Sequence, residues 1–344
     1  MLLAAVIMLA SLAAEIRVNP SIGLILAGSP VDGAQQQGAF TCTLFLRIDS
    51  AGAKQSVMII RSRFAPSPTG RLHLGHVLAA RIAFSLARDS GGAFLLRHED
   101  IDAPRVREHF YQGIEEDLEW LGLKWDGTAL RQSSRIAAYE AALESLRERG
   151  LVYPCFCTRR EIQDEWARMG AAPQGPEAPI YPGTCHKLTS DEQQTKLVSG
   201  LSCGWRLDSR KAHELAGPLT FRDLRFGEIP VDPDLLGDVV LARKDIGTAY
   251  HLAVIVDDGF QQISHVTRGE DLLSSTHVHR LLQVLLGIPA PLYLHHPLML
   301  DEAGNRLAKR CDSRSIAALR DSGLTPAQVL ALTDPPPGAA IVLS

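Results

Sequence analysis

Fourteen residues, the stretch RFAPSPTGRLHLGH from Arg63 to His76, concentrate side chains that bind phosphate. His73 and His76 flank a Leu-Gly pair at the expected start of a helix, where unpaired N–H groups and the helix dipole favour anions. Gly75 lets the backbone approach a ligand closely. A lone histidine is more often structural, but this pattern follows an expected strand and opens an expected helix. We therefore expect a phosphate-binding helix start with both imidazoles as donors.

A second group of residues has the side chains that bind zinc. Cys155, Cys157 and Cys185 lie near Tyr181 in the patterns Cys-x-Cys and Tyr-x-x-x-Cys. Four such ligands suit a tetrahedral metal, although Cys-x-Cys is less common than Cys-x-x-Cys, tyrosine is a rare ligand, and His186 is an alternative one. Spacing alone leaves open both a metal site in a reducing compartment and three buried thiols. The isolated cysteines are Cys42, Cys203 and Cys311.

The elements around the first stretch follow the order strand, loop, helix, strand. Residues 58–64 (MIIRSRF) predict a strand, 65–75 a loop, 76–92 a helix with a glycine stop, and 93–100 (AFLLRHED) a second strand. This order implies a parallel sheet with a right-handed crossover. Ligands of such sheets bind outside the carboxyl ends of the strands. The stretch from Arg63 and the RHED end of the second strand are therefore expected to face one crevice.

The rest of the chain continues the α/β pattern around an insert. Helices are expected near residues 106–121 and at 133–150, the second with a Ser cap and a Gly stop. Residues 151–190 break all periodicity, which predicts an insert rather than a sheet element. Later elements are expected as sheet strands at 248–259 (TAYHLAVIVDDG) and 261–271 (QQISHVTRGED), a helix at about 274–286, and one or two helices near the end.

Bulk composition is that of a globular protein and excludes a strongly basic nucleic-acid binder. Of the 344 residues, 46% are hydrophobic and 22% charged, and the formal net charge is −4. A polyanion must therefore meet a local patch. Residues 206–225 are a candidate, with a solvated face as the equally consistent alternative. The basic residues of this run are Arg206, Arg210, Lys211, Arg222 and Arg225.

The first 57 residues differ in character from the rest of the chain. MLLAAVIMLASLAAE is apolar, but no Lys or Arg precedes the run as in a signal peptide, and it is too short to span a bilayer. Residues 16–57 have no clear period, whereas Met58 opens the first expected strand. We expect residues 1–57 to be an extension of the reading frame and the working protein to begin near Met58, in the cytoplasm. N-terminal sequencing of native protein tests this expectation.

RFAPSPTGRLHLGH followed by LLRHEDIDAPR closely resembles the catalytic core of class I glutamyl-tRNA synthetases and their short relatives, the glutamyl-queuosine tRNA(Asp) synthetases. The resemblance covers most of residues 60–310. It implies that HLGH is the HIGH signature and that RFAPSPTG holds glutamate. The implied fold is α/β, a class I aminoacyl-tRNA synthetase catalytic domain with a Rossmann-type parallel sheet, a zinc-containing insert and no anticodon-binding domain.

The resemblance also implies domain boundaries after the extension at 1–57. The expected parts are the first half of the catalytic domain at 58–150, the insert with its zinc site and acceptor-contact region at 151–240, the second half at 241–300, and the lysine loop with C-terminal helices at 301–344.

A glutamate site is implied residue by residue. Arginine can bind a carboxylate through two N–H groups, so Arg63 and Arg268 suit the two carboxylates of glutamate, and Glu99 suits its ammonium group. The alternatives are a local ion pair of Glu99 with Arg97 and a core aromatic role for Tyr250. The implied glutamate-binding residues are Arg63, Phe64, Ala65, Pro66, Ser67, Glu99, Tyr250 and Arg268.

An ATP site is implied by the HLGH segment together with a second motif. RLAKR, residues 306–310, resembles the KMSKS loop and makes Lys309 the catalytic lysine, with Ala308 in place of the usual serine. A basic surface turn is the alternative. The resemblance gives catalytic roles to His73, His76 and Lys309 and phosphate contacts to these residues and Gly75, with Mg²⁺ accompanying ATP.

The resemblance also favours a metal site over three buried thiols, because the short family carries a Cys-x-Cys, Tyr-x-x-x-Cys site. It implies one structural Zn²⁺ held by Cys155, Cys157, Tyr181 and Cys185. Its role would be to stabilise an insert that has little core of its own.

The implied activity is activation of L-glutamate with ATP and its transfer to the queuosine base at the wobble position of tRNA(Asp), by a monomer with no membrane partner. Only residues 311–344 follow Arg310, where a complete glutamyl-tRNA synthetase continues into a helical anticodon-binding region. The DIDAPR segment and the Cys-x-Cys insert also resemble the short family. Two alternatives stay open: a glutamyl-tRNA synthetase core that charges tRNA(Glu), and a non-catalytic, zinc-stabilised tRNA or amino-acid binding module.

Overall fold

The computed structural model of the protein describes residues 45–48, 54–57, 59–169, 180–245, 247–299 and 315–334. Strands β1 (Phe45–Ile48) and β2 (Lys54–Val57) form an antiparallel hairpin in a small unit separate from the main one. The expectation that residues 1–57 are an extension stays a prediction. No helix within the described ranges is long and apolar enough to cross a membrane.

The first half of the main unit is the expected strand–helix–strand arrangement. Strand β3 (Arg61–Phe64) pairs in parallel with β4 (Ala93–His98), and helix α2 (Leu74–Asp89) connects them. Strand β5 (Leu130–Arg131) extends the sheet beyond β4, after helix α3 (Glu108–Trp120). The helix and strands share an apolar core, so the hydrophobic pattern explains this half. Its most buried side chains include Val77, Ala80, Ala83, Phe94, Leu96, Ile114 and Leu118.

The second half adds parallel strands beside β3. Strands β11 (His265–Gly269), β12 (Leu292–His296) and β8 (Thr220–Asp223) follow in that order, all parallel, and β9 (Gly227–Pro230) is antiparallel at the edge. The backbone N–H of Ser264 donates to the carbonyl of Arg61 at 3.0 Å, which brings β11 beside β3. The expected α/β fold with a parallel sheet is therefore confirmed. Strand β8 belongs to this sheet although it lies inside the range expected for the insert.

Two local expectations were wrong. Residues 248–259 were expected as a sheet strand, but helix α8 (Tyr250–Phe260) occupies them. Its run from Leu252 to Ile255 is buried on all sides, so it shows neither helical nor strand periodicity. Helix α4 (Ile136–Glu148) was expected to have a Ser cap, but both serines lie within a 3₁₀ turn at Gln132–Arg135 that precedes the helix, and Arg135 is the N-cap residue.

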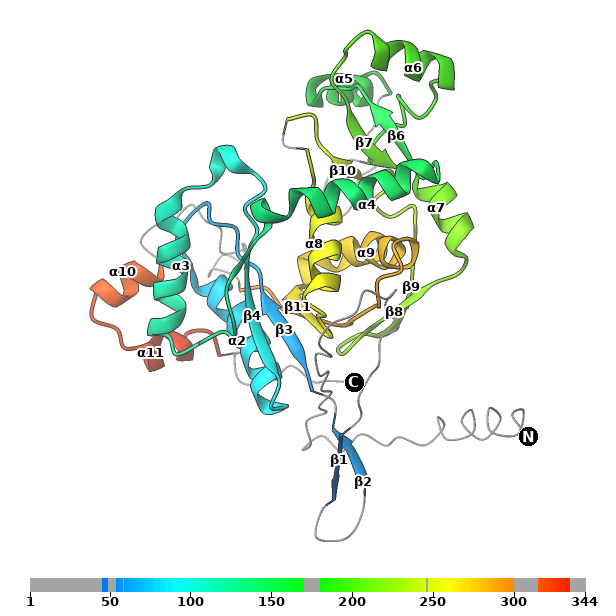
Figure 1. Cartoon of the computed structure of the whole chain (residues 1–344). Helices are drawn as coiled ribbons and strands as arrows, with labels where there is room; N and C mark the ends of the chain where they lie inside the picture. Colours follow the sequence, from blue (N-terminus) through cyan, green and yellow to red (C-terminus); the bar gives the residue numbers. More distant parts are fainter. Residues whose placement is uncertain are drawn as a thin grey trace, which may run out of the picture. The chain divides into compact units, whose positions relative to one another are not determined.

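Helices α8 and α9 (Leu273–Leu285) pack with α4 in a second apolar core. The insert contributes a separate antiparallel sheet, which Figure 1 shows above α4. Its elements are β6 (Val152–Cys155), α5 (Arg159–Met169), α6 (Ser190–Val198), β7 (Gly204–Leu207), α7 (Ser209–Ala216) and β10 (Val240–Ala242).

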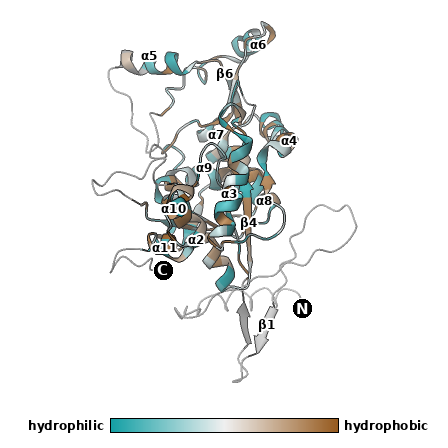
Figure 2. Ribbon diagram, turned by 90° about the vertical axis from the view of Figure 1, so that its left-hand side faces the viewer, coloured by the Kyte–Doolittle hydropathy of each residue, from teal (hydrophilic) through white to brown (hydrophobic). Residues whose placement is uncertain are grey.

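Helices α10 (Ile316–Asp321) and α11 (Pro326–Ala331) return to the first half of the sheet, beside α2 in Figure 2. Ser315 forms an isolated antiparallel bridge with His73, and the N–H of Ile316 donates to the carbonyl of Leu72 at 2.9 Å. The chain therefore comes back to the HLGH segment at residue 315.

Candidate active site

The two histidines of HLGH lie stacked at the start of α2. Their ring centroids are 3.7 Å apart, and the carbonyl of His73 accepts from the N–H groups of His76 and Val77 in the first helical turn. Nδ1 of His73 accepts from the N–H of Gly75, and Nδ1 of His76 accepts from the N–H of His73, both at 3.2 Å. In the neutral rings the proton therefore resides on Nε2, which makes each ring a donor at the helix N-terminus.

The loop after β3 is tied to the end of β4. The N–H of Glu99 donates to the carbonyl of Pro66 at 3.0 Å, and Ser67 Oγ donates to the carbonyl of Glu99 at 2.7 Å. The Ser67 hydroxyl proton is thus used within the loop, so its oxygen is left to accept from a ligand. Phe64 is buried in the first core, whereas Ala65 is half-buried. The structure thus brings the two expected strand ends together.

Charged side chains meet behind this loop around Asp258 of α8. Arg63 Nε donates to Asp258 Oδ1 at 3.0 Å, and Arg97 Nη1 donates to the same oxygen at 2.7 Å. Arg97 also pairs with Glu99 at 3.4 Å, so the local ion pair considered for Glu99 is present. Arg63 reaches β11 as well, donating from Nη1 to the carbonyl of Thr267 at 3.2 Å.

Burial and charge set the ionisation of this group. Burial alone would raise the pKa of Asp258, but Arg63 and Arg97 hold that pKa below its usual value. Burial raises the pKa of Glu99, and the same two arginines oppose the rise. Asp258 therefore stays ionised between the arginines, while Glu99 lies at the partly exposed edge of the group.

Arg268 and Tyr250 face the same region from β11 and the start of α8. Arg268 Nη1 lies 3.5 Å from the Tyr250 hydroxyl, and the Arg268 side chain is buried. Burial raises the pKa of Tyr250, and Arg268, Glu99 and Arg63 all act on it electrostatically. Tyr250 is therefore within electrostatic reach of all three charged residues of the expected glutamate site.

Sequence reasoning missed Asp258. The signal was available, because two adjacent aspartates at the end of an apolar run are costly to bury unless they are paired. The neighbouring Asp257 is fully buried and binds Gln132, Arg135 and Tyr139, which ties α8 to α4. Lys309 and its neighbours lie outside the described residues, so the lysine loop stays a prediction.

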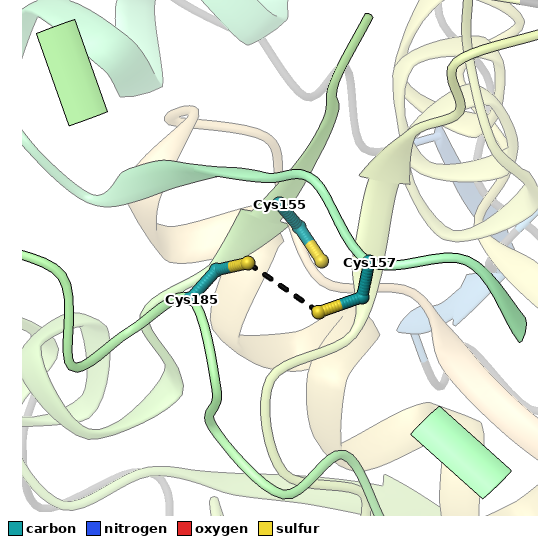
Figure 3. Close-up of side chains that lie close together, drawn as sticks. All are labelled: Cys155, Cys157 and Cys185. Atoms are coloured by element: carbon teal, nitrogen blue, oxygen red, sulfur yellow. Dashed lines mark hydrogen bonds between the residues drawn. The ribbon is translucent and has the colours of Figure 1, made fainter. Parts of the chain in front are cut away.

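Three cysteines of the insert converge with Tyr181. Figure 3 shows the side chains of Cys155, Cys157 and Cys185 directed toward one another, and their sulfur atoms all lie within 4.8 Å. The Tyr181 hydroxyl lies 3.5 Å from Cys155 Sγ and 3.4 Å from Cys157 Sγ. His186 is not part of the cluster, since its Nε2 lies 3.1 Å from Asp208.

These spacings fit a tetrahedral metal. With Zn–S near 2.3 Å and Zn–O near 2.0 Å, a tetrahedral ion separates two sulfurs by about 3.8 Å and a sulfur from an oxygen by about 3.5 Å. The Tyr181 distances match the second value, whereas the sulfur atoms of Cys157 and Cys185 lie 3.4 Å apart, slightly closer than the first. The Phe156 N–H donates to Cys185 Sγ at 3.3 Å, a contact that favours thiolate. The cluster is therefore compatible with zinc.

The basic run 206–225 is not simply a solvated face. Arg206 Nε donates to Cys155 Sγ at 3.3 Å and its guanidinium lies 3.7 Å above the Tyr181 ring. Arg225 pairs with Glu270 at 3.1 Å. Lys211 Nζ donates to the carbonyl of Gly150 at 2.8 Å. Three of the five basic residues therefore have internal partners, which weakens the run as a patch for a polyanion.

Comparison with known proteins identifies the family. The family of class I tRNA synthetases (E and Q), catalytic domain, matches residues 59–333. The Glutamyl-Q tRNA(Asp) synthetase of Rhodobacter capsulatus is 45% identical over 276 residues, which cover 78% of this chain and 97% of that protein. The protein of the same name from Nocardia farcinica is 45% identical over 271 residues, 78% of this chain and 82% of that protein.

Longer relatives match over the same region. Glutamate–tRNA ligase 2 of Syntrophus aciditrophicus is 36% identical, and the match covers 78% of this chain and 56% of that protein. The crystal structure of a glutamate tRNA ligase from Elizabethkingia meningosepticum, in complex with its amino acid, superposes with a TM-score of 0.63 at 30% identity, covering 77% of this chain. The match spans 53% of that ligase. The chain therefore belongs to the class I tRNA synthetases of the E and Q type and is a ligase of that class, as the resemblance of its motifs predicts.

Proposed function

We propose that the protein activates L-glutamate with ATP and transfers the glutamyl group to the queuosine base at the wobble position of tRNA(Asp). The observation that carries the first half is the convergence of Arg63, Glu99 and Arg268, from neighbouring strands, with Tyr250 at the start of α8. Two cations and one anion match a substrate with two carboxylates and one ammonium group.

The side chains divide the recognition of glutamate. Arg268 has no carboxylate partner among the described residues and binds one carboxylate of glutamate. Arg63 contributes to the positive electrostatic potential that attracts the other carboxylate. Glu99 and the acceptor oxygen of Ser67 receive the ammonium group, because the Ser67 proton is already used. The Phe64–Pro66 backbone shapes the wall of the site, since Phe64 itself is buried in the core.

ATP binds at the start of α2, with its phosphates on His73, His76 and the backbone at Gly75. Lys309 completes the phosphate site in this proposal. It precedes Ser315 by six positions in the sequence, and Ser315 is bridged to His73. Mg²⁺ bound with ATP would neutralise phosphate charge.

The first step is an in-line displacement. An α-carboxylate oxygen of glutamate attacks the α-phosphorus of ATP, a new P–O bond forms, and the bond to the β-phosphate oxygen breaks to release pyrophosphate. The protein positions the reactants and stabilises charge on the leaving group through the two Nε2–H donors. A hydroxyl of the acceptor then attacks the glutamyl carbonyl and releases AMP.

The choice of acceptor is supported by the relatives. Those named Glutamyl-Q tRNA(Asp) synthetase reach 45% identity, against 36% for the S. aciditrophicus glutamate–tRNA ligase. One Zn²⁺ would be held by Cys155, Cys157, Cys185 and Tyr181. Its role would be structural, because the hydrophobic core that the insert forms around these side chains is small.

Two assays separate the proposal from its alternatives. Glutamate-dependent ATP–pyrophosphate exchange by folded protein is expected for the enzyme, and its absence in the presence and absence of tRNA would favour a binding module. Transfer of labelled glutamate to tRNA(Asp) that carries queuosine, and not to tRNA(Asp) that lacks it, is expected for the proposed acceptor. Charging of tRNA(Glu) that is indifferent to queuosine would instead favour a glutamyl-tRNA synthetase core.

A further inference from the structure

Arg268 is a buried cation with an unusual set of partners. Its side chain is 6% exposed, and a charge buried to this degree is normally paired with a carboxylate. Arg63, equally buried, follows that rule through Asp258. Within the described part of the chain, Arg268 forms no such ion pair, and its hydrogen-bond partners are all uncharged acceptors.

Three close acceptors hold the guanidinium from two sides. Nη2 donates to Thr276 Oγ1 at 2.5 Å, Nη1 donates to His279 Nδ1 at 3.0 Å, and Nε donates to His295 Nε2 at 3.2 Å. Thr276 and His279 lie on α9, and His295 lies on β12. With the long contact to Tyr250, these bonds use four of the five N–H groups of Arg268.

The protonation pattern of His295 is imposed by a buried carboxylate. Asp223 Oδ2 lies 2.7 Å from His295 Nδ1 and also accepts from the backbone N–H of His295 at 3.1 Å, while Oδ1 accepts two further N–H groups. Both side chains are fully buried. An ionised Asp223 can only accept, so His295 carries its proton on Nδ1 and leaves Nε2 as the acceptor for Arg268.

His279 is oriented in a similar way. Because Nδ1 accepts from Arg268, the proton of the neutral ring is on Nε2, which lies 3.1 Å from His251 Nδ1. Burial lowers the pKa of both His279 and His295, so the two rings are neutral near pH 7. A protonated ring at either place would present a donor and a positive charge to the guanidinium.

We propose that Asp223, Thr276, His279 and His295 are positioning residues that hold the Arg268 guanidinium through neutral acceptors and so keep its charge available for a carboxylate of glutamate. A direct carboxylate partner would orient the guanidinium equally well but would compete with the substrate. Asp223 instead orients the His295 imidazole, which in turn accepts a hydrogen bond from Arg268. The inference rests on the proposed function, because it needs Arg268 to contact the amino acid.

Thr276 and His279 each allow a pair of matched variants. Thr276→Ser keeps the hydroxyl and Thr276→Val removes it at nearly the same volume. His279→Asn places an amide oxygen near the position of Nδ1, and His279→Leu removes the acceptor. We expect Thr276→Val and His279→Leu to raise KM for glutamate in ATP–pyrophosphate exchange by about 10- to 100-fold, the usual effect of losing a charged hydrogen bond. KM for ATP is expected to stay within about twofold of the wild-type value. Thr276→Ser and His279→Asn, which keep an acceptor for Arg268, are expected to show most of the wild-type affinity for glutamate.

Asp223→Asn tests the tautomer argument. Its amide NH₂ can donate to His295 Nδ1, which would move the ring proton to Nε2 and set it against the N–H of Arg268. We expect a rise in KM for glutamate at least as large as for Thr276→Val. Should this buried substitution prevent folding, the Thr276 and His279 pairs still decide the question.

The outcomes separate this inference from the proposed function. Wild-type protein that folds but shows no glutamate-dependent exchange overturns both. Wild-type exchange with an unchanged KM for glutamate in Thr276→Val and His279→Leu overturns the positioning role alone. Equal rises in KM for glutamate and ATP, with no recovery in Thr276→Ser or His279→Asn, show a merely structural role and also overturn it.

Discussion

Replacing Gly75 by alanine places a methyl group against the His73 ring. A Cβ at Gly75 would lie 3.1 Å from Cε1 and 3.2 Å from Nδ1 of that ring, whereas ordinary contacts begin near 3.4 Å. The ring must therefore move by about 0.3 Å, and the bond from the Gly75 N–H to Nδ1 is disturbed with it. The helix itself does not resist the change, since alanine is favoured over glycine in a helix by about 1 kcal/mol.

The expected loss of activity follows from these two effects. A misplacement of 1 Å can cost about 100-fold, so a shift of about 0.3 Å costs about fourfold. Losing the hydrogen bond from the Gly75 N–H to His73 Nδ1 weakens the positioning of the His73 ring by about 1 kcal/mol, which corresponds to about a fivefold lower rate. Gly75→Ala is thus expected to lower the rate of ATP–pyrophosphate exchange by about 5- to 20-fold, without lowering the free energy of unfolding.

A double-mutant cycle tests the cause. In a His73→Ala background the ring is absent, so Gly75→Ala is expected to cause little further loss of exchange. Urea unfolding of all four proteins checks stability. If Gly75→Ala lowers exchange equally in both backgrounds, or if it leaves exchange unchanged in the wild-type background, contact with the His73 ring is not what requires glycine.

Three further changes follow from the described contacts and the motif assignments. Asp258→Asn removes the carboxylate shared by two buried arginines and is expected to lower the free energy of unfolding at pH 7 by about 3–5 kcal/mol. Because the pKa of Asp258 is lowered in the folded state, this difference should shrink as the pH falls below about 4, and a constant difference down to pH 3 would contradict the assignment. Cys155→Ser should abolish the zinc content measured by elemental analysis while Cys203→Ser preserves it, and full zinc in the first variant would refute the cluster as a metal site. Lys309→Ala should reduce exchange at least about 100-fold with an unchanged circular dichroism spectrum, and unchanged exchange would show that the lysine loop is misassigned.

The features that could be predicted from the sequence were local. The β3–α2–β4 unit follows from apolar periodicity and a glycine stop, and the HLGH helix start follows from its place between them. The convergence of Cys155, Cys157, Tyr181 and Cys185 was expected from the family resemblance, because their spacing alone also allowed three buried thiols.

The features that could not be predicted depended on burial and on distant partners. Helix α8 was mistaken for a strand because a helix covered on all sides has no polar face. Asp258 contacts side chains 161 and 195 positions away, so the sequence could indicate that this aspartate needs a partner but not which arginines supply it. The positioning residues around Arg268 come from β8, α9 and β12. Their histidines are buried like ordinary core residues, and only the hydrogen bonds of their ring nitrogens show that they hold Arg268.

The site to which the glutamyl group is attached tests the central proposal most directly. Queuosine-containing tRNA(Asp) is incubated with the protein, ATP and labelled glutamate, and a nuclease digest then separates the wobble nucleoside from the 3′-terminal adenosine. We predict that the label is on the queuosine nucleoside and that tRNA(Asp) without queuosine stays unlabelled. Label on the terminal adenosine, or on tRNA(Glu) with no need for queuosine, would contradict it.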